Sequence, residues 1–386
     1  MIEFMFRDEE IKRIQTSLQN KDSILLLGVR RTGKTMLMKE IVRRHAGPGK
    51  AIYFDVSNYT SLYSFYNELM ANIPKSFLQR MSAILEAALP NDVMEWVRRH
   101  IDNVDINVGS ADSQARIKIG LREPLDTEKG VIRYWEPIAK AMLESLQDSN
   151  EIAFFAIDEF PFMLINLLRQ EVPANEITVA LATLRKLRAG IPILLSGSVS
   201  LDNLIALHSI PGAVLGDLLP EKLCPFKRSE ARSYLEVHLA GSPAATQIET
   251  VLDCLPDFIP FFLRECVRYL QILDDASNVD VVMENQVLPA IRRSFAGQFH
   301  ERLKSNYPDT ELLCAEQLLD QLAEAPENGA PINTKNLPSV HRQALTKLKY
   351  DMFIEEAPGY GYRFTLNILR LWWLNQRGVN GKISPG

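Results

Sequence analysis

Residues 24–35 read Ile-Leu-Leu-Leu-Gly-Val-Arg-Arg-Thr-Gly-Lys-Thr, and this stretch decides the fold. The apolar run 24–27 predicts a buried parallel strand, and apolar residues at helical spacing after Lys34 predict a helix. Between them lies G-x-x-x-x-G-K-T, a phosphate-binding loop in its usual setting of strand, loop and helix. The glycines let backbone N–H groups turn toward a phosphate, and the helix adds the positive end of its dipole. The alternative is a chance glycine turn, and the setting argues against it.

The loop predicts a site for ATP and Mg²⁺. Lys34 is expected to reach the β- and γ-phosphate oxygens, as a binding and a catalytic group, and the Thr35 hydroxyl to ligate Mg²⁺. Arg30 and Arg31 either face the phosphates or point outward toward a partner. The residues of this stretch expected to bind the nucleotide are Gly28, Arg30, Arg31, Thr32, Gly33, Lys34, Thr35 and Met36.

Composition narrows the class of protein. The chain has 386 residues, too many for one ordinary core, so two or three domains are expected. The net charge of −5 gives no global bias toward nucleic acid. The four cysteines are scattered without metal-site spacing, which favours reduced thiols in a cytoplasmic protein. No apolar run reaches the length of about 18 residues that a membrane-spanning helix needs, so no membrane partner is expected.

A second landmark is the apolar run 152–157, which ends in Asp158 and Glu159. The carboxyl ends of parallel strands meet at one edge of a sheet, where ligands bind. Asp158 is therefore expected to share the Mg²⁺ shell with Thr35. Glu159 is expected to orient and deprotonate the attacking water, as a general base does. Asp is also common at helix N-caps, so the acidic pair argues for catalysis only together with the loop.

The run 193–195 predicts another buried strand, which ends in Ser196-Gly197-Ser198 and is expected between the loop strand and the acidic strand. A hydroxyl there, Ser198 in particular, could bond the γ-phosphate or the water. The alternative is a turn that simply needs small residues. Candidates for the positive charge that stabilises the transition state are Arg185, Arg188, Arg228 and Arg264.

The whole pattern predicts an α/β P-loop NTPase core with a parallel sheet, a helical lid and a C-terminal winged helix. The predicted domains are an ATPase core over 1–223, a lid over 224–305 and a winged helix over 306–386. The core carries an inserted helical and hairpin segment at 75–129, with the hairpin at 105–119. The winged helix is expected to have Leu312, Leu313, Leu318, Leu319 and Leu322 along one wall of its core.

These motifs resemble the archaeal-type ATPases, a STAND-related, AAA+-like branch of the P-loop NTPases. The resemblance rests on Gly-x-Arg-Arg-x-Gly-Lys-Thr at 28–35, Asp-Glu-Phe at 158–160 and Ser-Gly-Ser at 196–198. It implies that the N-terminal segment with Arg7 packs near the adenine. It also implies that Pro260, in the lid segment 255–263, faces the nucleotide. The chain departs from the family at Asp257 or Phe258, where a glycine is usual, and at Gly216-Asp217, where Gly-Arg is frequent.

The favoured hypothesis is an ATP-driven switch that couples hydrolysis to assembly with a protein partner or with itself. The alternative is an AAA+-like ATPase that loads or remodels a complex on DNA. In that hypothesis the helix 339–349 would meet DNA with His341, Arg342, Lys347 and Lys349. A small-molecule kinase is disfavoured, because two adjacent carboxylates suit water activation. The sequence leaves open which base, adenine or guanine, the nucleotide carries.

Overall fold

The computed structural model describes residues 6–102, 133–146, 150–197, 201, 205, 210–307, 309–325, 329–332, 334, 336–357 and 361–377. They fall into two compact units. The sheet unit holds Asp8–Leu27 and Lys34–Lys222. The C-terminal unit holds residues 6–7, Gly28–Gly33 and the described chain from Leu223 onward. The predicted hairpin 105–119 and Ser198 lie outside the described residues.

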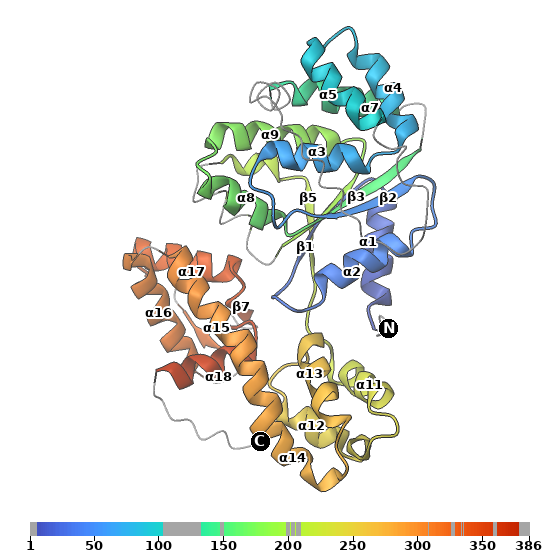
Figure 1. Cartoon of the computed structure of the whole chain (residues 1–386). Helices are drawn as coiled ribbons and strands as arrows, with labels where there is room; N and C mark the ends of the chain where they lie inside the picture. The colour runs from blue at the N-terminus through green and yellow to red at the C-terminus, as the bar shows by residue number, and fades with distance from the viewer. Residues whose placement is uncertain are drawn as a thin grey trace. The chain divides into compact units, whose positions relative to one another are not determined.

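The sheet unit is built on five parallel strands (Figure 1). They are β1 (Ser23–Leu27), β2 (Lys50–Asp55), β3 (Ile152–Asp158), β4 (Ile193–Ser196) and β5 (Leu218–Lys222). Their order is β2-β3-β4-β1-β5, so the strand ending at Ser196 lies between the loop strand and the acidic strand, as predicted. This confirms the predicted α/β P-loop fold with its parallel sheet.

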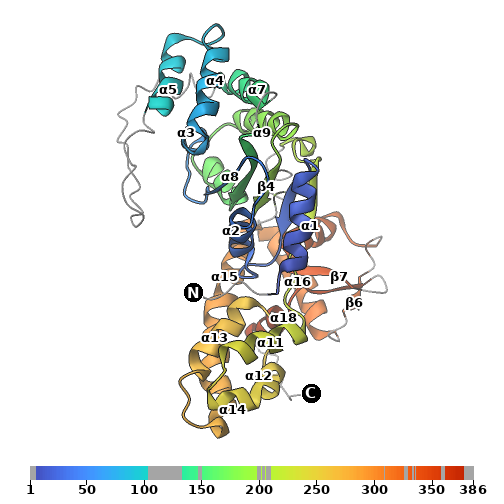
Figure 2. The same cartoon turned by 90° about the vertical axis from the view of Figure 1, so that its right-hand side faces the viewer.

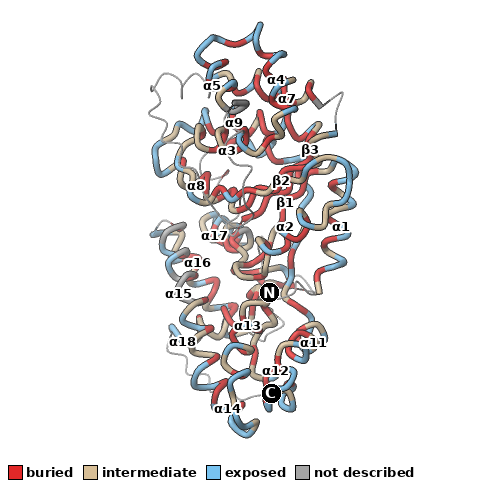
Figure 3. Tube along the Cα trace, turned by 45° about the vertical axis from the view of Figure 1, so that its right-hand side comes forward, coloured by how far each residue is buried: buried red, intermediate tan, exposed pale blue. Residues whose placement is uncertain are grey.

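Helices cover both faces of this sheet, because residues of each strand alternate between the two sides. On one face pack α1 (Asp8–Gln19) and α2 (Lys34–Arg43). The buried side chains Leu25, Phe155 and Leu195 point to the other face, where α3 (Leu62–Asn72), α8 (Phe160–Arg169) and α9 (Ala174–Arg188) join the same apolar cluster. Figure 3 shows the central strands β1, β3 and β4 buried along most of their length.

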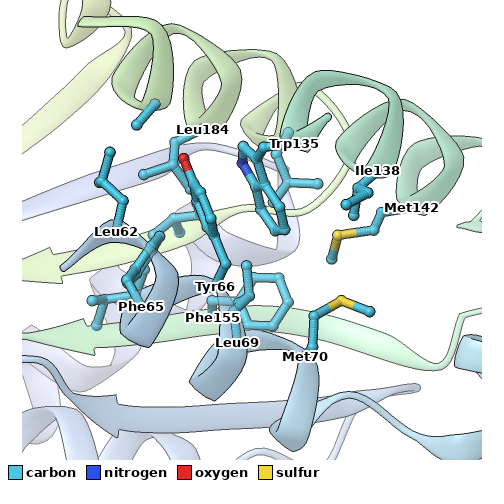
Figure 4. Close-up of a cluster of buried hydrophobic side chains, with 14 of the residues drawn as sticks. Leu62, Phe65, Tyr66, Leu69, Met70, Trp135, Ile138, Met142, Phe155 and Leu184 are labelled. Carbon is cyan, nitrogen blue, oxygen red and sulfur yellow. The ribbon is translucent and has the colours of Figure 1, made fainter. Parts of the chain in front are cut away.

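Two helices of the predicted insertion, α4 (Lys75–Leu85) and α5 (Asn91–Asp102), join that cluster together with α7 (Trp135–Leu146), which follows the insertion. Tyr66 of α3 stacks on Trp135 of α7 with ring centroids 3.9 Å apart and planes 12° from parallel (Figure 4). Both rings are fully buried, together with Trp96 of α5. These helices therefore share the core of the sheet unit and do not fold as a separate layer.

The C-terminal unit contains the predicted lid and winged-helix segments (Figure 2). The lid segment contains α11 (Arg228–His238), α12 (Ile248–Cys254), α13 (Pro260–Leu270), α14 (Val279–Val282) and α15 (Leu288–Asn306). A single apolar cluster runs from this segment into the rest of the unit. Phe262, Phe295, Phe299 and Phe353 form a ladder through it, with successive ring centroids 5.2, 5.0 and 5.4 Å apart.

The last part of the chain has the element order predicted for a winged helix. It contains α16 (Asp309–Glu324), β6 (Ala330–Pro331), α17 (Ser339–Tyr350), β7 (Ile354–Ala357), β8 (Gly361–Phe364) and α18 (Asn367–Gln376). The strands form an antiparallel sheet in the order β6-β8-β7. One predicted core residue is wrong: Leu313 is 59% exposed, because it lies on the side of α16 opposite Leu319 and Leu322.

Candidate functional site

Asp158, at the carboxyl end of β3, is a buried acid that accepts three hydrogen bonds. It is 1% exposed. Its Oδ2 accepts a hydrogen bond from the Tyr53 hydroxyl at 3.1 Å. Its Oδ1 accepts bonds from the Ser196 hydroxyl and from the backbone N–H of Glu159, the latter at 3.0 Å. Donors from β2, from β4 and from the turn after β3 therefore fix one carboxylate at the edge where parallel strands place a ligand.

Tyr53 is the member of this group that sequence analysis missed. Its pKa is raised, first by burial and then by the charge of Asp158. The phenol therefore stays protonated at neutral pH and keeps donating to the carboxylate. The run 51–56 indicated a strand, but a tyrosine in a strand is too common to mark a site. The pairing of Asp55 with Asp158 across β2 and β3 is what brings Tyr53 within reach.

Glu159 occupies an unusual backbone conformation, with φ 56° and ψ 33°. This left-handed region costs a residue with a Cβ of the order of 1–3 kcal/mol when the structure enforces it. Glu159 also stands at the N-cap of α8, yet its side chain makes no capping hydrogen bond there. A residue that is strained and does not cap its helix is typical of a functional position rather than a structural one.

Ser196 and Gly197 have different roles in the structure, and the contact of the Ser196 hydroxyl is one that the sequence did not predict. The Ser196 hydroxyl donates to Asp158, so it holds the acid in place. Gly197 meets a packing demand: a Cβ there would overlap the ring of Pro161, at the start of α8. The small residue is thus required by close approach, while the hydroxyl serves the carboxylate.

The phosphate loop shows the local geometry expected of its glycines. Gly33 has φ +94°, a conformation that favours glycine. A Cβ on Gly28 would come within 3.1 Å of the Thr32 hydroxyl. The Thr32 hydroxyl donates to the Val29 carbonyl at 2.8 Å, so its side chain closes the loop on itself. After the loop, α2 begins with Lys34, which is buried, and Thr35, which is half-buried; Met36 is 54% exposed.

Arg31 of the loop packs on the lid segment of its own unit. Its guanidinium lies 4.1 Å from the ring centroid of Phe261 in α13, and that of Arg264 lies 5.2 Å from the same ring. Burial and the charge of Arg264 lower the pKa of Arg31. Its Nη1 is buried and has no hydrogen-bond partner among the described atoms. A Cβ on Gly33 would lie 4.0 Å from Pro260, the first residue of α13.

Arg7, which the resemblance placed near the adenine, is buried and bonded within the C-terminal unit. Its Nη2 donates to the Cys224 carbonyl at 2.8 Å, and its guanidinium lies 4.4 Å from the ring centroid of Phe226. The ring of Phe6 meets Phe226 edge-on, with centroids 6.1 Å apart. Residues 6 and 7 thereby hold the start of the lid segment in place.

All four candidate arginines lie within ion-pair distance of a carboxylate, Arg264 at 3.7 Å from Glu265. Arg188 is 4% exposed, and its Nε donates to Asp217 at 2.9 Å. Burial tends to raise the pKa of Asp217, but the hydrogen bond and charge of Arg188 outweigh it and leave that pKa below its ordinary value. Arg185 lies 3.7 Å from the same carboxylate. Arg228 contacts Glu249 and Asp253 at the surface. Asp217, which stands where the family often has arginine, therefore binds two arginines of this chain.

The residues present fit a nucleotide with Mg²⁺. Mg²⁺ takes oxygen ligands, usually one or two from the protein and the rest from phosphates and water. Thr35 and Asp158 supply such oxygens, and hydrogen bonds that orient a ligating carboxylate, as those to Asp158 do, are a regular feature of metal sites.

Comparison with known proteins gives one family match: residues 20–136 match the family described as an AAA domain. No curated protein is significantly similar in sequence. Solved structures with some likeness include the Aeropyrum pernix ORC1 protein in complex with DNA, at 15% identity and TM-score 0.34, covering 98% of this chain and 94% of that one. Pyrobaculum aerophilum Cdc6p has 10% identity and TM-score 0.41, with 97% and 95% covered. The Aeropyrum pernix ORC2 protein has 15% identity and TM-score 0.41, with 97% and 96% covered. Likenesses this distant say nothing of what the chain binds.

The phosphate loop, the strand order and the family match together support an AAA+-like P-loop ATPase core.

Proposed function

We propose that the protein is an ATP-dependent switch ATPase of the archaeal-type, STAND-related branch. The observation that carries the proposal is the end of β3, where a buried and triply bonded Asp158 precedes a strained Glu159. A parallel sheet in which one strand ends in such a pair, and the strand two places away leads into G-x-x-x-x-G-K-T, is suited to phosphoryl transfer to water. The division into core, lid and winged helix is part of the proposal.

Each residue has a stated task. Lys34 and the loop N–H groups hold the β- and γ-phosphates. Thr35 and Asp158 hold Mg²⁺, which would neutralise charge on the phosphate oxygens. Glu159 accepts the proton of the attacking water. Tyr53 and Ser196 keep Asp158 oriented. Ser198 remains a candidate for contact with the γ-phosphate.

The test compares two variants with a surface control. Lys34→Ala should lose ATP affinity tenfold or more, because a charge-assisted contact to phosphate is worth roughly 1.5–3 kcal/mol. Glu159→Gln should keep affinity for Mg-ATP but lose about 10²–10⁴-fold in turnover. Lys12→Ala, on the exposed side of α1, removes the same charge elsewhere and should change neither ATP affinity nor turnover. Calorimetry and phosphate release measure both quantities; unchanged ATP affinity in folded Lys34→Ala would end the phosphate-loop hypothesis.

The DNA-handling alternative has less support, because the cations of α17 are engaged within the C-terminal unit. Lys347 pairs with Glu311, and Lys349 pairs with Glu356. Arg342 donates to the backbone carbonyl of Leu337, and His341 bonds Gln317. We therefore propose a protein partner or self-association first and expect at most weak DNA binding, about 10⁻⁴ M or poorer at physiological salt. Among the residues described here, no helix is long and apolar enough to cross a bilayer.

Fluorescence anisotropy with duplex and single-stranded DNA, with and without ATP, tests this ranking. Tight, ATP-dependent binding that is abolished by Arg342→Glu together with Lys347→Glu would make DNA the partner.

A further inference from the structure

Asp257 makes a contact that spans the C-terminal unit. It lies in the lid segment just before α13, where either Asp257 or Phe258 stands in place of the glycine that is usual in the resembling family. Its Oδ1 accepts a hydrogen bond from the backbone N–H of Asn367 at 3.0 Å. Its Oδ2 accepts one from the N–H of Ile368 at 2.8 Å. Both donors belong to the first turn of α18, 110 and 111 residues further along the chain.

These two bonds replace a missing local cap. The first N–H groups of any helix have no partner inside the helix, and a side-chain oxygen at the N-cap usually accepts from them. The N-cap residue of α18 is Leu366, whose side chain cannot do so. Asp257 takes over this role, and its negative charge also suits the positive end of the helix dipole.

The same segment contacts the phosphate loop. Phe261, four residues after Asp257, carries the Arg31 guanidinium on its ring, and Pro260 faces Gly33. Arg31 has φ 68°, so the loop holds this side chain on Phe261 from a strained backbone. Within five residues, the chain thus reaches both the loop and the last helix.

The lid segment and α18 also share one apolar cluster, to which Ile368, Leu369 and Trp373 of α18 belong, so a movement of one is resisted by the other. The aromatic ladder from Phe262 to Phe353 crosses from α13 to the residue that precedes β7. A close-packed interior transmits such strain because it has few voids in which to absorb it.

We propose that residues 257–261 couple the phosphate loop to α18. Phe261 follows Arg31 as the loop changes between its empty and nucleotide-bound forms. Asp257 passes the displacement to the first turn of α18, so that the state of the loop sets the stability of that helix. The coupling rests on the proposed function, because it takes ATP as the ligand of the loop. The capping of α18 by Asp257 does not depend on that function.

Hydrogen exchange on the full chain, with and without Mg-ATP, tests the proposal. Without nucleotide, Asp257→Ala should lower the protection of α18 amides about 5- to 30-fold, which corresponds to roughly 1–2 kcal/mol. Asp257→Asn keeps an acceptor oxygen but loses the charge, so its α18 protection should lie between that of the wild type and that of Asp257→Ala. The matched control is Asp253→Ala, which removes a carboxylate from the neighbouring α12, where it contacts Arg228 at the surface; it should leave α18 unchanged.

Hydrogen exchange with Mg-ATP tests the coupling separately from the cap. In the wild type, Mg-ATP should change α18 protection; in Asp257→Ala that response should vanish, while ATP affinity stays within about twofold of wild type. Phe261→Leu should keep the cap without nucleotide and lose the response to it. If Asp257→Ala kept the wild-type protection of α18, Asp257 would not cap that helix. If α18 of Asp257→Ala still responded to Mg-ATP, the coupling would be wrong. If the wild type binds no ATP, the proposed function fails, and the coupling with it; the result without nucleotide still decides the cap.

Discussion

Gly197→Ala is the substitution whose cost the structure defines best. A Cβ at this position would overlap Cγ and Cδ of Pro161, well inside the 3.0 Å that real Cβ atoms keep. A proline ring has no side-chain rotation that would move it aside, so β4 and the start of α8 must separate. Overpacking of this kind costs about 1–3 kcal/mol, and the rigid neighbour places Gly197→Ala at the upper end. The loss of backbone freedom in the unfolded chain returns only about 0.4–1 kcal/mol.

The expected net loss is therefore about 2 kcal/mol or more. For a unit of roughly 200 residues each kcal/mol lowers Tm by about 2–4 °C, so Tm should fall by about 4–8 °C or more. Because Ser196 precedes Gly197 and donates to Asp158, the displacement should also weaken Mg²⁺-dependent ATP binding. Thermal unfolding followed by circular dichroism, and calorimetry with Mg-ATP, give the two readouts.

The chain offers a matched control in Gly212. A Cβ at Gly212 would meet nothing within 4 Å, so Gly212→Ala makes the same chemical change without a clash. It should be neutral or stabilising by up to about 1 kcal/mol. If both variants unfolded at the wild-type temperature, the close approach of Gly197 to Pro161 would not exist in solution, and the packing argument would be wrong.

Two further predictions follow from single residues. Glu159→Gly should relieve the left-handed backbone and raise stability by about 1 kcal/mol while turnover is lost; a variant that unfolds more easily than wild type in urea would contradict the strain. Glu40 accepts hydrogen bonds from Arg43 and Arg44, which lower its pKa to about 2. Its folded pKa lies below the unfolded value, so its contribution is complete above about pH 4.5 and disappears as pH falls toward 2. The difference in urea midpoint between wild type and Glu40→Gln should shrink over that range; a constant difference would show that the carboxylate contributes through its shape alone.

The sequence predicted the parts of the fold in which one local signal acts alone. The loop, the strand ending at Asp158 and the place of the strand ending at Ser196 follow from apolar runs, glycines and the rule that parallel strands share an edge. The helix 62–72 was predicted with the bounds that the structure shows, because Ser61 caps its first turn.

Other elements were missed where two signals compete. The strand β5 contains Pro220, which argues against a strand; it is tolerated because β5 is at the edge of the sheet and pairs with β1 alone. The helix α8 follows directly on Glu159, so its apolar start continues the apolar run of β3 and hides the change of period. Tyr53 and the cap made by Asp257 depend on contacts between distant segments, which no spacing along the chain can indicate.

The place of β1 in the sheet has a consequence for synthesis. Both of its neighbours, β4 and β5, come late: the Ser23 side chain accepts a hydrogen bond from a backbone N–H 170 residues further on. At about 5–20 residues per second, a ribosome takes roughly 10–40 s to supply those partners. During that interval an almost wholly apolar strand has left the exit tunnel without a neighbour on either edge. The strand that carries the phosphate loop is thus a segment of the nascent chain that needs protection until β4 and β5 have been synthesised.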